Sequence, residues 1–284
     1  MKTVLTGLIL LCVHTAAAAL DANTSAVELN TPPTAPPSQS EPASMPELNA
    51  QSVLVYDQVS GRPLLAKNAT MQTPIASITK LMTAMLVINA GLPLDERITL
   101  TSDDRDTLKG TGSRLAIGAH YTRGQLLHLA LIASDNRAAH ALARSYPGGL
   151  ERFVATMNRT ARVLGMRDTV YVEPTGLSSS NRSTALDLAK LADYAYQNYP
   201  EIRQITATGM DDWHIGLSKT GFINEAGHCL VMQAEVADRD VIIVLLDAMG
   251  NNSRANDAAR IKAWLEETSP AHGTRAHYTA ASRT

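Results

Sequence analysis

The last third of the folded region constrains the fold most, because it holds three strand patterns in close succession. Residues 213–223, 230–236 and 241–247 are rich in apolar residues, and short polar turns separate them. Two more strands, at residues 52–56 and 64–66, begin the folded region. Strands at both ends of the folded region, with helical patterns between them, predict an α+β fold. We expect an antiparallel sheet that is flanked by helices and carries an inserted helical subdomain.

The middle of the chain supplies the helical patterns. Residues 78–90 form a strongly apolar helix, which Gly91 and Pro93 stop. Thr122 is placed to cap a helix that runs to about residue 133. Further helices are predicted at residues 137–145, 150–164, 184–199 and 254–266.

The N-terminus has the pattern of a secretory signal. Lys2 precedes a short apolar run, and small residues follow at positions 16–19. We therefore predict a cleaved signal peptide at residues 1–19, a Pro-rich disordered linker at 20–47, a folded domain at 48–267 and a flexible tail at 268–284. After cleavage the chain retains only Cys229, which cannot form an internal disulfide and is expected to be a packed structural thiol.

Composition argues against several classes of function. The formal net charge of −2 gives no electrostatic reason to expect a nucleic-acid partner. The eight histidines show no H-E-x-x-H spacing, so a zinc peptidase is disfavoured and no metal is expected. Neither a P-loop nor a dinucleotide fingerprint is present. We expect no cofactor.

The first chemical motif is Ser77 with Lys80, at the start of the apolar helix. Residues three apart lie on one helix face, so the hydroxyl and the amine can meet. A serine hydroxyl needs an adjacent base, and a lysine serves only when its pKa is lowered. The alternative is a capping serine followed by a surface lysine. Residues 81–88 carry no charge, which favours a buried Lys80.

Two further motifs are weak when taken singly. Ser134-Asp135-Asn136 follows an apolar helix and could be an ordinary turn or cap, and Ser179-Ser180-Asn181 fits the same S-x-N pattern. Lys219-Thr220-Gly221 lies in a predicted strand, where the alternative is an edge lysine beside a bulge. A glycine inside a strand often marks close approach of a ligand. In this order the three motifs form the signature shared by penicillin-binding proteins and class A β-lactamases.

From residue 48 to residue 264 the chain resembles the low-molecular-weight penicillin-binding proteins, which are serine D-alanyl-D-alanine peptidases. It is most similar to their endopeptidase branch. The matching stretches are residues 74–84, 112–115, 133–139, 173–178, 183–185, 219–222 and 226–232.

The resemblance implies a role for each matching residue. Ser77 would be the nucleophile, Lys80 its base, and Ser134 the group that passes a proton to the leaving amine. The substrate would be bound by Asn136, Lys219, Thr220, Gly221 and Phe222. The backbone N–H groups of Ser77 and Phe222 would form the oxyanion hole.

The resemblance also implies a substrate, inhibitors and a location. The expected substrate is the stem peptide of bacterial peptidoglycan, cut at D-alanyl cross-links, which would give the enzyme a part in cell-wall biogenesis and cell shape. β-Lactams would be covalent inhibitors. The protein would work in the periplasm, with at most loose membrane association, because residues 268–284 cannot form the family's extra β-domain and amphipathic helix.

Three alternatives stay open at this point. The enzyme could be mainly a carboxypeptidase, since both reactions share the same acyl-enzyme. It could be an inactive homologue that only binds peptidoglycan or penicillin, because residues 205–212 form a shorter segment than the family usually has. It could be a β-lactamase, although Glu173 lacks the Glu-x-x-Leu-Asn spacing of that class.

Overall fold

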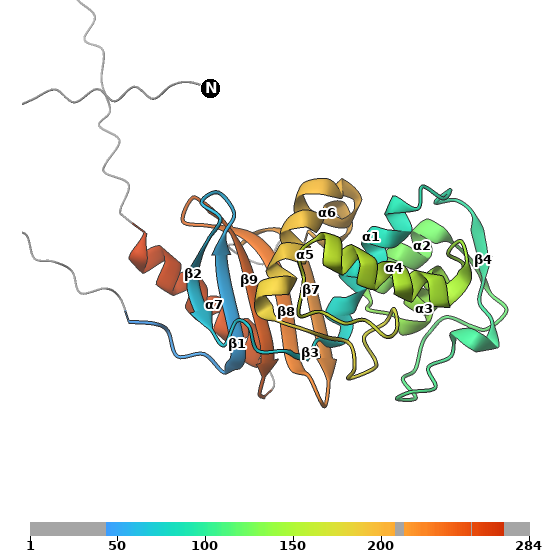
Figure 1. Ribbon diagram of the computed structural model, residues 1–284, viewed down its shortest axis with the longest axis horizontal. Helices are drawn as coiled ribbons and strands as arrows, with labels where there is room; N and C mark the ends of the chain where they lie inside the picture. Colours follow the sequence, from blue (N-terminus) through green and yellow to red (C-terminus); the bar gives the residue numbers. More distant parts are fainter. Residues whose placement is uncertain (1–43, 208–212, 251, 270–284) are drawn as a thin grey trace, which may run out of the picture. The chain divides into compact units, whose positions relative to one another are not determined.

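A five-stranded antiparallel sheet forms the centre of the structure, in the order β2-β1-β9-β8-β7 (Figure 1). The computed structural model describes residues 44–207, 213–250 and 252–269. The predicted signal peptide, most of the predicted linker and nearly all of the predicted tail therefore lie outside the described residues. The strands of the sheet are β1 (Ala50–Asp57), β2 (Arg62–Lys67), β7 (His214–Ile223), β8 (Gly227–Val236) and β9 (Arg239–Ala248).

The remaining elements lie mostly between β2 and β7 in the chain. The helices are α1 (Thr79–Asn89), α2 (Arg123–Ile132), α3 (Asn136–Arg144), α4 (Gly149–Val163), α5 (Ala185–Asn198), α6 (Pro200–Thr206) and α7 (Ser253–Thr268). The 3-10 turns are η1 (Ala76–Ile78) and η2 (Ser102–Asp104). Short strand pairs join β3 (Thr73–Pro74) to β6 (Arg182–Ser183) and β4 (Arg97–Thr99) to β5 (His120–Thr122).

Both faces of the sheet are buried. Alternate residues of β9 separate into two hydrophobic clusters: Val241, Ile243 and Leu245 join the cluster that contains α7, and Ile242 and Val244 join the cluster that contains α5. This is the period of two that a strand requires. Each such side chain stabilises the fold by roughly 1.5–3 kcal/mol when fully buried. The sheet therefore has a helix layer on each face, as Figure 1 shows.

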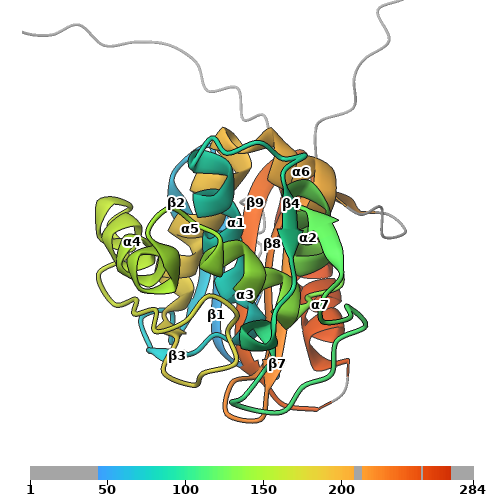
Figure 2. The same ribbon diagram turned by 90° about the vertical axis from the view of Figure 1, so that its right-hand side faces the viewer.

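The helical subdomain surrounds α1, whose neighbours are α2, α3, α4 and α5 (Figure 2). Every residue of α1 from Thr79 to Val87 is buried, as the absence of charge at residues 81–88 predicts. Thr122 caps α2 by accepting a hydrogen bond from the Gln125 backbone, which confirms the predicted cap. Among the described residues, no helix combines the length and the hydropathy that a membrane span requires.

The predicted fold class and the order of the main elements are confirmed. Several local features differ from the sequence prediction. Residues 76–78 form a 3-10 turn before α1, so Ser77 and Lys80 meet across the junction of two elements and not on one α-helix. Helix α6, which Pro200 begins, was not predicted, and neither were the short strands β3, β4, β5 and β6.

Candidate active site

Ser77 lies in η1, where the helical subdomain meets the β7 edge of the sheet. A methyl group at Gly221 would come within 2.9 Å of the Ser77 backbone nitrogen, and one at Gly176 would come within 1.9 Å of the Ala76 carbonyl oxygen. Two glycines therefore let β7 and a loop lie close against the turn that carries Ser77. The atom nearest to such a methyl group at Gly221 belongs to the backbone of Ser77, and the expected approach of a ligand to Gly221 stays a prediction.

Lys80 is completely buried, and its amine has three partners. The Nζ atom lies 2.8 Å from Ser77 Oγ, 2.7 Å from Asn136 Oδ1 and 2.7 Å from the Thr175 carbonyl oxygen. The alternative of a surface lysine is therefore wrong.

The three partners suit a neutral amine. The Asn136 and Thr175 oxygens can only accept hydrogen bonds, whereas the Ser77 hydroxyl can also donate. A neutral amine gives its two N–H groups to the two acceptors and turns its lone pair toward Ser77. Burial, reinforced by the positive charge of Lys219, lowers the pKa of Lys80 to about 7. The amine is thus a base of suitable strength beside the hydroxyl.

The Asn136 amide is held in its orientation by residues that the sequence analysis did not single out for catalysis. Asn136 Nδ2 lies 3.0 Å from Thr111 Oγ1, which in turn donates to Asp106 Oδ2 at 2.6 Å. Because Thr111 gives its hydrogen to Asp106, its oxygen is left to accept from the amide, and Asn136 Oδ1 must face Lys80. No local motif points to Thr111, which lies in a loop 25 residues before Asn136.

Ser134 and Lys219 form the second polar pair of the site. Lys219 Nζ lies 3.0 Å from Ser134 Oγ and 2.9 Å from the Thr220 carbonyl oxygen. Ser134 adopts a left-handed backbone with φ of 52°, an unusual conformation for a serine, just before Asp135 caps α3. Burial, together with the charge of Arg254, lowers the pKa of Lys219 to about 8. Since Lys219 donates to Ser134, the serine keeps its own hydrogen for another acceptor.

The Glu173 loop supplies the carbonyl that binds Lys80. The Glu173 carboxylate accepts hydrogen bonds from the backbone N–H groups of Thr175, Gly176 and Ser178. Asn181 also donates to this carboxylate and to Thr79 Oγ1. Asn181 thus joins the Glu173 loop to α1 by hydrogen bonds. The second S-x-N match, at residues 179–181, is not part of the site. Residues 173–178 were predicted to match a loop of the family, but the part that the Glu173 carboxylate plays in shaping this loop was not predicted.

Gly221 and the remaining predicted site residues lie on β7. Lys219 and Gly221 are buried, whereas Thr220 and Phe222 are exposed. The Phe222 ring stacks on His228 with a centroid distance of 4.5 Å.

Cys229 is fully buried, and burial raises the pKa of its thiol to about 11, as expected of a structural thiol. Among the described residues, no group of three or more His, Cys, Asp or Glu side chains is arranged to hold a metal ion.

A serine hydroxyl beside a buried lysine amine, between a helical subdomain and a sheet edge, defines a serine acyl-enzyme of the penicillin-binding fold. The sequence profile described as D-alanyl-D-alanine carboxypeptidase matches residues 39–250. The chain belongs to this family of serine peptidases.

Known relatives agree with this assignment. The chain is 43% identical to a D-alanyl-D-alanine endopeptidase of Pseudomonas aeruginosa over 78% of each chain, and 40% identical to one of Escherichia coli over 79% of each. A Streptomyces DD-transpeptidase crystal structure superposes with a TM-score of 0.71 at 27% identity, over 78% of this chain and 98% of that one. A penicillin-binding protein of Listeria monocytogenes in its cefotaxime-bound form gives 0.69 at 30% identity, over 77% and 97%.

Thr111→Val should slow acylation by a fluorescent penicillin about tenfold, the effect of one lost hydrogen bond to a charged or polarised group. Valine keeps the side-chain shape but cannot accept from Asn136, so the amide can rotate away from Lys80. Thr111→Ser, which restores the hydroxyl, should acylate at close to the native rate. Equal rates for the valine variant and the native protein would show that Thr111 does not position Asn136.

The acylation rate should form a narrow bell against pH. It should rise as Lys80 loses its proton near pH 7 and fall as Lys219 loses its charge above about pH 8. Stopped-flow measurement of penicillin acylation between about pH 5 and pH 10 gives this profile. A rate that keeps increasing up to pH 10 would contradict a lowered pKa for Lys80.

Proposed function

We propose that the protein is a DD-endopeptidase that cuts D-alanyl cross-links in bacterial peptidoglycan. The observation that carries this proposal is the Lys80 amine, buried and directed at Ser77 by two obligate acceptors. The relatives supply the substrate class: those at 43%, 40% and 33% identity are D-alanyl-D-alanine endopeptidases, and carboxypeptidases follow at 28–29%.

In the acylation step, Ser77 Oγ forms a bond to the carbonyl carbon of D-alanine while its proton moves to Lys80 Nζ. The backbone N–H groups of Ser77 and Phe222 stabilise the resulting oxyanion. The carbon–nitrogen bond then breaks, and Ser134 donates its hydroxyl hydrogen to the leaving nitrogen. The proton that Lys80 took from Ser77 replaces it on Ser134, so Lys80 is again a neutral amine when the acyl-enzyme has formed. Lys219, hydrogen-bonded to Ser134, supplies positive charge at this point.

In the second step, a water molecule attacks the ester carbonyl and gives a proton to Lys80. Lys80 passes this proton to Ser77 Oγ as the ester bond breaks, which releases the D-alanyl product and restores the Ser77 hydroxyl. The polar groups around Ser77 would bind the substrate. Asn136 would hold a substrate amide through the hydrogen-bonding capacity that Lys80 and Thr111 leave unused. Thr220 and Phe222 are the exposed residues of β7 and can contact the substrate directly.

β-Lactams would inhibit the protein at the same site, because their strained amide would acylate Ser77. The cefotaxime-bound Listeria structure supports this part of the proposal. The signal-like N-terminus supports export to the periplasm, where peptidoglycan lies.

The proposal is tested with purified muropeptides. The native protein should cut a cross-linked muropeptide dimer into monomers, and Ser77→Ala should abolish both this cleavage and labelling by fluorescent penicillin. Mass analysis identifies the products, and circular dichroism checks that the variant is folded. A protein that labels with penicillin and trims monomeric pentapeptide but leaves the dimer intact would be a carboxypeptidase instead.

The penicilloyl-enzyme should persist for minutes. Both oxygens of the Glu173 carboxylate accept hydrogen bonds from their own loop, so this carboxylate is committed to structure and not to activating water. Nitrocefin turnover reports deacylation directly. Sustained hydrolysis at about 10 per second or faster, an ordinary enzyme rate, would favour a β-lactamase.

A further inference from the structure

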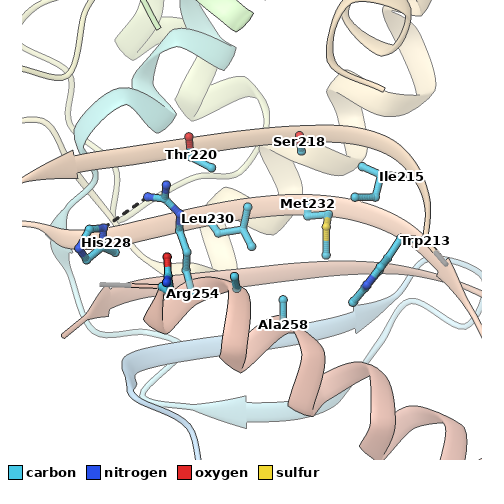
Figure 3. Close-up of a pocket in the computed structure, with 11 residues that line it drawn as sticks. Trp213, Ile215, Ser218, Thr220, His228, Leu230, Met232, Arg254 and Ala258 are labelled. Carbon is cyan, nitrogen blue, oxygen red and sulfur yellow. Dashed lines mark hydrogen bonds between the residues drawn. The ribbon is translucent and has the colours of Figure 1, made fainter. Parts of the chain in front are cut away.

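A cavity of about 620 Å³ lies between the α7-facing side of β7 and β8 and the first turns of α7 (Figure 3). One end is polar and contains Thr220, His228 and Arg254. The other end is apolar, and its lining residues include Trp213, Ile215, Leu230, Met232 and Ala258. The volume is in the range of cavities that enclose small organic ligands.

The polar end of the cavity adjoins the catalytic strand. Arg254 Nη1 lies 3.5 Å from the Gly221 carbonyl oxygen and 3.5 Å from His228 Nδ1. Its positive charge lowers the pKa of both His228 and Lys219, although burial has the larger effect on each. Arg254 therefore places a cation where the cavity meets the active site, and Thr220 belongs to both.

The order of residues along β7 shows which part of a substrate would enter the cavity. Ser77 lies against Gly221, and Ser134, the proposed donor to the leaving amine, is bound to Lys219. The leaving side of the substrate thus extends from Gly221 toward the start of β7. The cavity follows the strand in this same direction, from Thr220 past Ser218 to Ile215.

We infer that this cavity is the subsite for the leaving strand of the cross-link, an inference that rests on the proposed function. Its occupant is an amino-acid side chain with a carboxylate near the scissile amine and a longer aliphatic portion. The carboxylate complements Arg254, and the aliphatic portion fills the apolar end. A free D-alanine, with one methyl group, would leave the apolar end unfilled. The cavity therefore selects cross-link cleavage over release of terminal D-alanine.

Filling the apolar end tests this inference. Ala258 lines the cavity and is 7% exposed, and Ala255 lines it from an exposed position on α7. In Ala258→Phe and Ala255→Phe, the rate of dimer cleavage divided by the rate of D-alanine release from pentapeptide should fall about tenfold or more, the discrimination that a few methylenes give. Ala259→Phe is the matched control, because Ala259 is exposed and is not among the residues that line the cavity. It should keep the native ratio.

The possible outcomes separate the inference from the proposed function. Penicillin acylation reports whether the catalytic groups of each variant remain assembled. If the native protein cleaves the dimer and both filled variants keep the native ratio, the inference is overturned and the function stands. An equal fall in both reactions, in a folded variant, also overturns it. A native protein that leaves the dimer intact overturns both the function and the inference.

Discussion

The hydrogen bonds of the buried Lys80 amine determine how the rest of the site is built. Removing an amine from water costs several kcal/mol if its N–H groups find no partners. The structure offsets this cost with the Asn136 side chain and the Thr175 carbonyl, and it leaves the third position to Ser77. The supports of these partners come from distant parts of the chain. The Glu173 carboxylate shapes the Thr175 loop, and Thr111 fixes the Asn136 amide.

The sheet has a matching role on the other side of Ser77. Lys219, on the edge strand β7, donates a hydrogen bond to Ser134. The strand lies close against η1 because Gly221 has no side chain. The strands β1 and β9, from opposite ends of the folded region, pair beside β8 and hold β7 in place. The fold therefore fixes the distance between Ser77, in η1, and Lys219, in β7. The same strand, through Thr220, continues into the cavity beside α7, which links cleavage to the choice of leaving group.

Much of this arrangement could be predicted from the sequence, because it depends on local signals. The three strand patterns, the Thr122 cap and the uncharged helix around Lys80 each follow a short-range rule. The supporting contacts could not be predicted in this way. Thr111 and Glu173 lie in loops, and their partners are set by tertiary structure without any periodicity. A strand glycine such as Gly221 leaves the same signal in a sequence whether a backbone segment or a ligand approaches it, so its contact with the Ser77 backbone could not be predicted.

Direct titration of the Lys80 amine tests the central claim that this lysine is a base at neutral pH. NMR of protein labelled with ¹⁵N at the lysine side chains, with the Lys80 resonance assigned by its loss in Lys80→Arg, gives the pKa of this one group. We predict a pKa of about 7 for Lys80, lowered by burial and by the charge of Lys219. A value near 10.5, that of an ordinary lysine, would contradict it.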